Sequence, residues 1–422
     1  MLLVYRLFIN ILYPFFIFFI YVRIFFKKED KFRYKEKIFS SFFNISKKQD
    51  KKLIWFHAAS IGEVNSILPL IEKLNEIKDL EFLITTVTLS SSNLLKKKNL
   101  KKNIIHRFFP VDKQSLVKRF LDDWRPDLIL FVESEIWPNF ILEIKKRKIP
   151  LVLLNARISK KTFNKWMLIS SFAKSIFQSF DICLTSNKES KDYLSFFEVK
   201  NTRYLGNLKI SSENNFIKSN KFNSKLLEQK KFWCALSTHK PEELFCLKTH
   251  LKVKSHHKNL VTVIIPRHIN RSKSIKKECD SLNLRSQILN ENEKIDQESE
   301  IIIINSYGSV SNYLSICKSV FIGKSLVKKL SSNGGQNPIE AAKSGCKIYH
   351  GPYIYNFQEV YELLYKMSFS EKVLYENDLA KKLAQDLNET NKLNNLPVEN
   401  INILGRKILK NTFEEIKLII NK

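Results

Sequence analysis

The chain has 422 residues, a length that predicts two or three domains. Hydrophobic residues make up 44% and aromatic residues 12%, which excludes a disordered chain, and 9 Gly and 11 Pro exclude a collagen-like fibre. The formal net charge of +29 leaves nucleic acid, an anionic membrane surface and phosphorylated substrates as possible partners. Six widely spaced cysteines without a C-x-x-C pair favour a reduced compartment and no structural metal.

Residues 2–26 are almost wholly apolar, and about 20 apolar residues are needed to span a bilayer as a helix. The segment therefore predicts an uncleaved membrane anchor over residues 1–28, with an amphipathic or buried helix as the alternative. Six lysines and arginines follow between residues 27 and 37, so the positive-inside rule places the rest of the chain in the cytoplasm. The same basic cluster suits anionic lipid head groups.

From residue 53 onward, short apolar runs alternate with helical patterns, which is typical of βαβ units and a parallel sheet. The first series of predicted strands comprises residues 53–60, 81–88, 104–110, 127–134, 149–156 and 181–186. The second series comprises residues 231–238, 260–267, 300–306, 319–325 and 346–351.

These two series predict two doubly wound α/β domains, over residues 29–210 and 231–422. The polar stretch between them, residues 211–230, is rich in Asn, Ser and Lys and is interpreted as a linker. Ligands of such sheets bind at the carboxyl ends of the strands, so the expected site is a cleft between the two domains.

The string HAASIGEV, residues 57–64, follows a predicted strand and opens a helix, which places Glu63 in the first helical turn. Glu63 is either a general base or only a favourable acid at the positive end of the helix dipole. The strand in ESEIWPNF ends in Glu133 and Glu135, which share a face if the strand continues. Such a pair raises one pKa or binds a cationic or hydroxylated group, unless it is a solvated strand end. Arg157 in NARIS is placed at the rim of the cleft, where a surface ion pair is the alternative.

In the second half, Ser237, Thr238 and His239 form a strand-to-helix turn whose hydroxyls and free amides suit an anion. Arg267 ends the next strand, aimed at a phosphate or carboxylate.

The strongest pattern is NGGQNPIEAAKSG, residues 333–345. Gly334 and Gly335 permit a close backbone approach, Pro338 suits the first helical turn, and Glu340 is placed to accept from ribose hydroxyls. The pattern suits a nucleotide, with a plain turn and helix cap as the alternative.

Taken in order, HAASIGEV, ESEIWPNF, NARIS, GNLKI, ALSTHKPEE, IIPRHINR and GGQNPIEAAKSG followed by GPYIYNF resemble the bacterial Kdo transferases, from the anchor to about residue 364. The resemblance implies a GT-B fold, in which an acceptor-binding and a CMP-Kdo-binding Rossmann-like domain face each other across a cleft behind an N-terminal anchor helix. It implies an inverting glycosyltransferase that moves 3-deoxy-D-manno-octulosonic acid (Kdo) from CMP-Kdo to the lipid A precursor (lipid IVA) in lipopolysaccharide biosynthesis. Its expected location is the bacterial inner membrane, with the catalytic domains in the cytoplasm.

By this resemblance Glu63 matches the family's catalytic base. The family's CMP contacts fall on Pro266, Arg267, Gly308, Ser309, Val310, Asn337, Pro338, Ile339 and Glu340. Further candidate substrate-binding residues are Glu133, Glu135, Arg157, Ser237, Thr238, His239, Gly334 and Gly335. Three positions depart from the common family pattern: Ser309 replaces Glu, Gln336 replaces His and Lys324 replaces Gly.

The implied chemistry calls for no metal and no other cofactor, because arginine and helix N-termini hold a cytidylate leaving group and no Asp-x-Asp motif occurs in the chain. A basic surface beside an anchor would collect a bisphosphorylated acceptor, which explains the charge better than nucleic acid does. One alternative is a GT-B transferase that uses another nucleotide sugar and a membrane acceptor. The other is a basic RNA- or DNA-binding membrane protein, which is disfavoured because interleaved aromatic and basic stripes are missing from the sequence.

Overall fold

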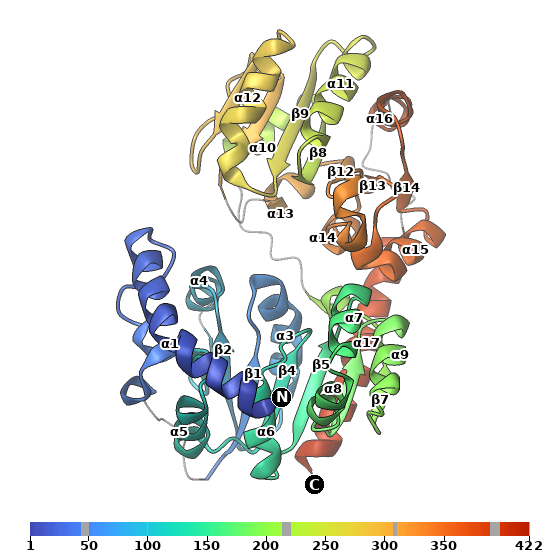
Figure 1. The fold of residues 1–422 in the computed structure, drawn as a ribbon. Coiled ribbons are helices and arrows are strands. Elements are labelled where there is room, and N and C mark those ends of the chain that lie inside the picture. Colours follow the sequence, from blue (N-terminus) through green and yellow to red (C-terminus); the bar gives the residue numbers. More distant parts are fainter. Residues whose placement is uncertain (44–49, 99, 213–220, 307–309, 389–396, 422) are drawn as a thin grey trace. The chain divides into compact units, whose positions relative to one another are not determined.

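The computed structural model describes residues 1–43, 50–98, 100–212, 221–306, 310–388 and 397–421. The chain divides into two compact units, Met1–Glu213 with Leu404–Lys422 and Asn214–Ile403. In the described part of the chain, each unit contains a seven-stranded sheet whose paired strands are parallel, with helices packed on it (Figure 1). The predicted fold class, two doubly wound Rossmann-like domains, is confirmed.

The first sheet has the strand order β3-β2-β1-β4-β5-β6-β7. Its strands are β1 (Lys52–His57), β2 (Leu80–Thr86), β3 (Ile104–Phe108), β4 (Leu128–Val132), β5 (Leu151–Ala156), β6 (Ile182–Thr185) and β7 (Thr202–Tyr204). The chain first builds β1, β2 and β3 in one direction and then returns to place β4 on the other side of β1. The strand order therefore reverses between β1 and β4, the point where doubly wound sheets bind their ligands.

The second sheet has the strand order β10-β11-β9-β8-β12-β13-β14. Its strands are β8 (Lys231–Thr238), β9 (Leu260–Pro266), β10 (Ser286–Leu289), β11 (Ile301–Ile304), β12 (Ser319–Ile322), β13 (Lys347–His350) and β14 (Ser370–Lys372). By the same logic its strand order reverses between β8 and β12.

Helices connect the strands within each unit. Those of the first unit are α1 (Leu2–Phe25), α2 (Lys35–Ile38), α3 (Ile61–Leu74), α4 (Leu89–Lys97), α5 (Gln114–Trp124), α6 (Pro138–Lys146), α7 (Lys160–Met167), α8 (Ser170–Phe177), α9 (Lys188–Phe196) and, from Leu404 on, α17 (Val398–Ile420). Those of the second unit are α10 (Lys221–Glu228), α11 (Glu242–Lys254), α12 (Ser272–Ser281), α13 (Val310–Leu314), α14 (Ile339–Lys343), α15 (Gln358–Lys366) and α16 (Glu376–Asn388).

An aromatic core packs on one face of the first sheet, beneath its central strands β1 and β4. The ring of Trp55 on β1 packs against Phe109, Phe120, Phe131 and Phe140, with centroid distances from 4.9 to 6.2 Å. All five side chains are buried, and the indole nitrogen of Trp55 donates to the Thr85 hydroxyl. Interlocked large rings leave little freedom to the backbone above them, so the strand ends that follow are held in place.

The C-terminal helix α17 departs from the predicted domain boundary, which assigned residues 231–422 to the second domain. Residues Leu404–Lys422 cluster with the first unit. Gly405 allows α17 to approach the Ile210 carbonyl, because a Cβ there would lie 2.5 Å from that oxygen, and Lys52 on β1 donates to the carbonyl of Ile420. Figure 1 shows this helix in red, and Lys73 of α3 lies over the Phe413 ring of α17 at 4.9 Å. Its apolar periodicity is the same whichever sheet it packs on, so the sequence pattern did not distinguish them.

The predicted linker over residues 211–230 also differs from the structure. Residues 213–220 lie outside the described residues, but residues Lys221–Glu228 form helix α10. Asn223 anchors this helix to the second unit, since its side chain donates to the Glu293 carbonyl and accepts from the Ile295 amide. The helix is only eight residues long and stands next to a polar stretch rich in Asn, Ser and Lys, so it is hard to recognise from the sequence.

Helix α1 is the one helix among the described residues that is long and apolar enough to cross a membrane, judged by length and composition alone. Only 11% of its most apolar window is buried in the protein. The helix is consistent with membrane association.

Candidate active site

Glu63 lies in the first turn of α3, directly after the carboxyl end of β1. Its carboxylate accepts hydrogen bonds from the Ala59 amide (2.8 Å) and the Ser60 hydroxyl (2.7 Å), while Ser60 accepts in return from the Glu63 amide (3.4 Å). This reciprocal pair is a variant of the capping box, in which the carboxylate reaches the Ser60 hydroxyl and the Ala59 amide in place of the Ser60 amide, and it fixes the carboxylate at the start of the helix. The Glu63 side chain is buried, so neighbouring protein groups and not bulk water surround its carboxylate.

The pKa of Glu63 is raised to about 7, first by burial and then by the negative charge of Glu133. Glu135 raises it further, whereas the hydrogen bonds from Ser60 and Ala59 oppose the rise. Burial and like charge therefore outweigh the stabilisation that the helix N-terminus gives to the ionised carboxylate. A carboxyl with a pKa near 7 exchanges protons readily at neutral pH.

Glu133 and Glu135 stand near Glu63 but do not share a strand face as predicted. Strand β4 ends at Val132, and Glu133 has a φ of 59°, so the chain turns before the alternation can continue. The Glu135 carboxylate accepts from the Trp137 indole (2.9 Å) and lies 3.1 Å from Nε2 of His57. Burial alone would raise the pKa of Glu135, but the contacts with His57 and Trp137 outweigh burial and lower this pKa below its ordinary value. The two carboxylates thus have separate partners.

Two residues that the sequence analysis did not select complete this edge. His57 is fully buried, stacks on Phe109 with 3.7 Å between ring centroids, and lies within 3.0 Å of the Thr85 hydroxyl. Lys209 forms an ion pair with Glu133, and its side chain passes within 3.7 Å of the space beside Gly62. His57 opens the recognised string HAASIGEV and Lys209 is part of GNLKI, but only the fold brings Lys209 to Gly62.

Asn155 and Arg157 follow β5 at the same edge. The Asn155 side chain accepts from the Leu208 amide (2.9 Å), which holds the segment carrying Lys209 against the sheet. Arg157 is half-buried, and its amide donates to the Glu133 carbonyl (3.3 Å). The structure therefore brings Glu63, Glu133, Glu135 and Arg157 to one sheet edge.

In the second unit, Glu242 organises the reversal point between β8 and β12. Its buried carboxylate accepts from four amides, those of His239 (2.9 Å), Lys324 (2.7 Å), Ser325 (2.8 Å) and Leu326 (2.9 Å). Burial raises the pKa of Glu242, and these backbone hydrogen bonds oppose the rise. The glutamate ties the loop after β8 to the loop after β12.

The predicted donor residues lie around this junction. The Arg267 amide donates to the Thr238 carbonyl (3.1 Å), which sets the end of β9 against the end of β8. The side chain of Arg267 is exposed, and His239 and His268 meet edge-on at 5.7 Å between ring centroids. The hydroxyl oxygen of Thr238 is buried without a hydrogen-bond partner in the described structure.

Gly334 and Gly335, the glycine pair of the strongest sequence pattern, allow their loop to pack closely against the backbone of Tyr353 and Ile354. A Cβ on Gly334 would lie 2.6 Å from the Tyr353 carbonyl, and Gly335 has a φ of 81°. The Gly335 amide donates to the Lys324 carbonyl (2.7 Å), so this loop joins the same edge as the β12 turn. Pro338 is the N-terminal cap residue of α14, with Ile339 buried and the side chains of Asn337 and Glu340 exposed.

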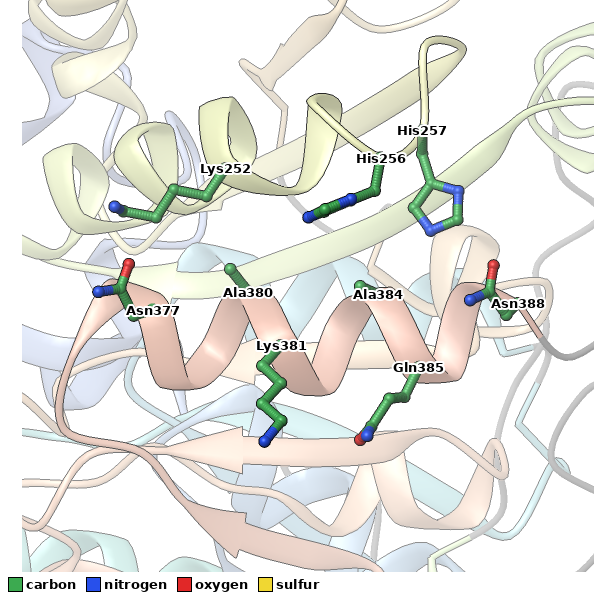
Figure 2. A pocket seen from close by; sticks show the side chains of 9 residues that line it. All are labelled: Lys252, His256, His257, Asn377, Ala380, Lys381, Ala384, Gln385 and Asn388. Atoms are coloured by element: carbon green, nitrogen blue, oxygen red, sulfur yellow. The ribbon is translucent and has the colours of Figure 1, made fainter.

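Of the predicted turn at residues 308–310, Gly308 and Ser309 lie outside the described residues, and Val310 begins α13. A separate cavity of about 480 Å³ lies between α16 and α11 with the loop after it, where Lys252, His256 and His257 face Asn377 and Asn388 (Figure 2). None of the predicted site residues lines it.

Comparisons with known proteins bear on the family and the fold of this chain. A family profile described as 3-deoxy-D-manno-octulosonic-acid transferase (kdotransferase) matches residues 33–212. The 3-deoxy-D-manno-octulosonic acid transferase of Rickettsia bellii is 32% identical over 347 residues, which cover 81% of this chain and 80% of the relative. The Haemophilus influenzae protein of the same name is 28% identical over 321 residues, covering 74% and 73%.

Solved structures agree in fold. A UDP-N-acetylglucosamine 2-epimerase aligns with a TM-score of 0.60 at 12% identity, over 88% of this chain and 97% of its own. The epimerase of that name from Rickettsia bellii aligns with a TM-score of 0.53 at 13% identity, over 87% and 98%. Both show two-domain GT-B-like architecture and nothing about substrate. The sequence identity to the Rickettsia transferase extends over most of both chains, and on that ground the chain belongs to the 3-deoxy-D-manno-octulosonic acid transferase family and is a glycosyltransferase.

Proposed function

We propose that this enzyme transfers Kdo from CMP-Kdo to the lipid A precursor (lipid IVA), with inversion at the anomeric carbon. The Glu63 carboxylate takes the proton of the acceptor hydroxyl while that oxygen bonds to the anomeric carbon. The bond to the cytidylate phosphate breaks at the same time, and CMP leaves with its electron pair. A single displacement of this kind needs one base and yields inversion.

One observation carries the proposal: a buried carboxylate with a pKa of about 7 stands at the reversal point of the first sheet. The capping box holds Glu63 in place, and the neighbouring carboxylates keep its proton affinity high enough to accept a proton at neutral pH. We assign the acceptor to this first unit, with Glu133, Glu135 and Arg157 as further substrate contacts.

We assign the donor to the second unit. Arg267 presents an exposed guanidinium at the end of β9, suited to a phosphate or carboxylate. The ends of β8 and β9, the segment between β11 and α13 and the segment between β12 and α14 supply the remaining contacts. These are Ser237, Thr238, His239, Pro266, Gly308, Ser309, Val310, Gly334, Gly335, Asn337, Pro338, Ile339 and Glu340. The proposal routes no step through a metal, because a cationic side chain and backbone amides suffice to hold a monophosphate leaving group.

We place the enzyme at the cytoplasmic face of the bacterial inner membrane, where α1 and the basic residues after it meet anionic lipids. A lipid acceptor and a soluble nucleotide sugar would meet at such a surface.

The test is to incubate the full-length protein in detergent with lipid IVA and CMP-Kdo and to follow the acceptor by mass spectrometry. The expected result is a mass increase of one or more Kdo units, with inversion of the anomeric configuration seen by NMR. Parallel reactions with UDP-sugars serve as the control for another nucleotide-sugar specificity. Transfer from a UDP-sugar without transfer from CMP-Kdo would contradict the proposal.

A further inference from the structure

Helix α1 presents two different apolar faces. The residues that point toward the folded unit recur every three or four positions, Tyr5, Ile9, Tyr13, Ile17, Ile20 and Ile24. A second set, at intervals of three, four or seven residues, is offset by about half a turn and is largely exposed, Leu3, Leu7, Ile11, Phe15, Phe18 and Phe25. One side of the helix is therefore covered by protein and the other is not.

The covered face contacts the first unit along the length of the helix. Near its start, the Tyr5 hydroxyl donates to the buried Asp112 carboxylate (2.8 Å), and Arg6 donates to the Asn139 side chain (3.0 Å). In the middle, the Tyr13 hydroxyl donates to the Ile38 carbonyl, and the Lys113 ammonium stands 4.0 Å from the Tyr13 ring centre.

Near its end, Ile20 packs with Tyr34 and Ile38 in a small core, and Arg23 pairs with Glu29 at 2.8 Å. At 1.5 Å per residue, the contacts from Tyr5 to Ile24 extend over ~28 Å, about the thickness of the hydrocarbon core of a bilayer.

These contacts conflict with a helix that crosses the membrane. A crossing helix would either carry Lys113, Glu143 and Asp112 of the folded unit into the hydrocarbon, or break away from them. Breaking away would leave the Asp112 carboxylate without its Tyr5 hydrogen bond, and would expose Ile38, which is now fully buried. The first course is unfavourable because charged groups are costly in lipid. The second is unfavourable because it exposes apolar surface to water and breaks buried hydrogen bonds.

The exposed face fits the surface of an anionic bilayer. It carries Phe15 and Phe18, 66% and 69% exposed, and is followed by Phe25 and Phe32, 81% and 82% exposed. The exposed lysines Lys27, Lys28 and Lys31 lie between these last two aromatic residues in the sequence. Apolar side chains beside cations are the two features that hold an interfacial helix on anionic lipid.

We propose that α1 lies in the plane of the membrane, with its exposed face in the lipid and its other face on the first unit, and does not cross the bilayer. This goes beyond the proposed location at the membrane, on which it rests, by stating how the helix meets the lipid. In this arrangement α1 is part of the surface of the folded first unit, and that surface attaches the protein to the membrane without a spanning anchor. Both ends of α1 then remain on one side of the membrane.

The test measures the depth of three exposed positions. Leu7→Cys, Phe15→Cys and Phe25→Cys are made singly in the full chain and labelled with an environment-sensitive fluorophore, a simple procedure because all six native cysteines are buried. The labelled proteins are bound to vesicles of anionic phospholipid that carry quenchers at defined depths. An in-plane helix places all three labels at one shallow depth, about 5–10 Å below the head groups. A spanning helix places Phe15 deepest, by ~12–15 Å relative to the other two.

Two control positions complete the experiment. A label at Ile9→Cys, on the covered face, and one at Ser281→Cys, on the exposed surface of the second unit, should escape lipid quenching. Graded depths would overturn the proposal. So would a failure to bind vesicles combined with dimer formation, since a second copy would then cover the apolar face. The measurement uses no sugar substrate, so a failure of the proposed transferase reaction would be recognised separately.

Discussion

In each unit, the helix after the first strand of the sheet carries a glutamate in its first turn. The two glutamates have different surroundings, and we expect different roles for them. Glu63 follows β1 and Glu242 follows β8. Glu63 accepts from one amide and one hydroxyl and faces the charge of Glu133, which helps to raise its pKa to about 7. Glu242 accepts from four amides of two loops.

The comparison teaches that position in the fold does not assign a role to a carboxylate. A carboxylate saturated by backbone amides ties loops together, because releasing it would leave four donors unpaired. A buried carboxylate with fewer donors and like charges nearby retains affinity for a proton. We therefore expect Glu63 to control rate and Glu242 to control stability.

The largest expected effect is on turnover. Glu63→Gln should lower kcat by roughly 10²–10⁴-fold, the usual contribution of a positioned general base, with CMP affinity unchanged. The melting temperature should fall little, because the Gln oxygen can still accept from Ser60. Glu72→Gln, an exposed acid on the same helix, is the matched control and should behave as wild type. Turnover near the wild-type rate in Glu63→Gln would exclude this base, and Glu133 or Glu135 would be examined next.

The counterpart in the second unit should show the reverse pattern. Glu242→Gln places an amide NH₂ against backbone donors and should lower the free energy of unfolding by ~1.5–3 kcal/mol, the range for hydrogen bonds to a charged group. Chemical denaturation measures this loss, and the rate at saturating substrate, corrected for folded protein, should stay within a few-fold of wild type. A stable variant with a large loss of turnover would break the comparison between the two glutamates.

A third effect concerns donor binding. Arg267→Ala should weaken CMP binding by ~1.5–3 kcal/mol, about 10- to 150-fold, without changing the melting temperature, because the side chain is exposed. Lys at this position should restore part of the affinity, since a point charge cannot reproduce a planar fork. Calorimetry with CMP measures both variants, and Arg285→Ala, another exposed arginine of the second unit, is the control. Unchanged affinity in Arg267→Ala would remove it from the donor site.

The smallest effect is a shift in the pH profile. Glu63 must be ionised to accept a proton, so kcat should fall toward tenfold per unit below about pH 7 and level off above it. Glu133→Gln removes a negative charge that raises the Glu63 pKa, so the acidic limb should move to lower pH. An acidic limb that stays in place in Glu133→Gln would argue that another group controls it.

The interior strands could be predicted from the sequence because strands of a parallel sheet that are covered on both faces read as continuous apolar runs. The edge strands β7, β10 and β14 were missed. They are three or four residues long and contain Arg203, Gln287 and Glu371, so they show neither an apolar run nor a clear alternation.

The candidate site was predicted to the extent that it lies within local motifs. Glu63 and Arg267 could be placed because each follows a strand, and strand ends meet at one edge of a parallel sheet. Lys209 could not be placed, since its position beside Gly62 depends on the Asn155 hydrogen bond to the Leu208 amide. The raised pKa of Glu63 could not be predicted from the sequence either, because burial and the approach of Glu133 are properties of the fold.

The N-terminal helix separates what the sequence determined from what the tertiary structure decided. Length and composition determined that residues 2–25 form an apolar helix that water solvates poorly. Composition is apolar on all sides of this helix, so it carries no information about which side meets protein and which meets lipid. That choice was decided by Asp112, Ile38 and Tyr34, which come from other segments of the chain and present their hydrogen-bonding and apolar groups to one face of α1 only.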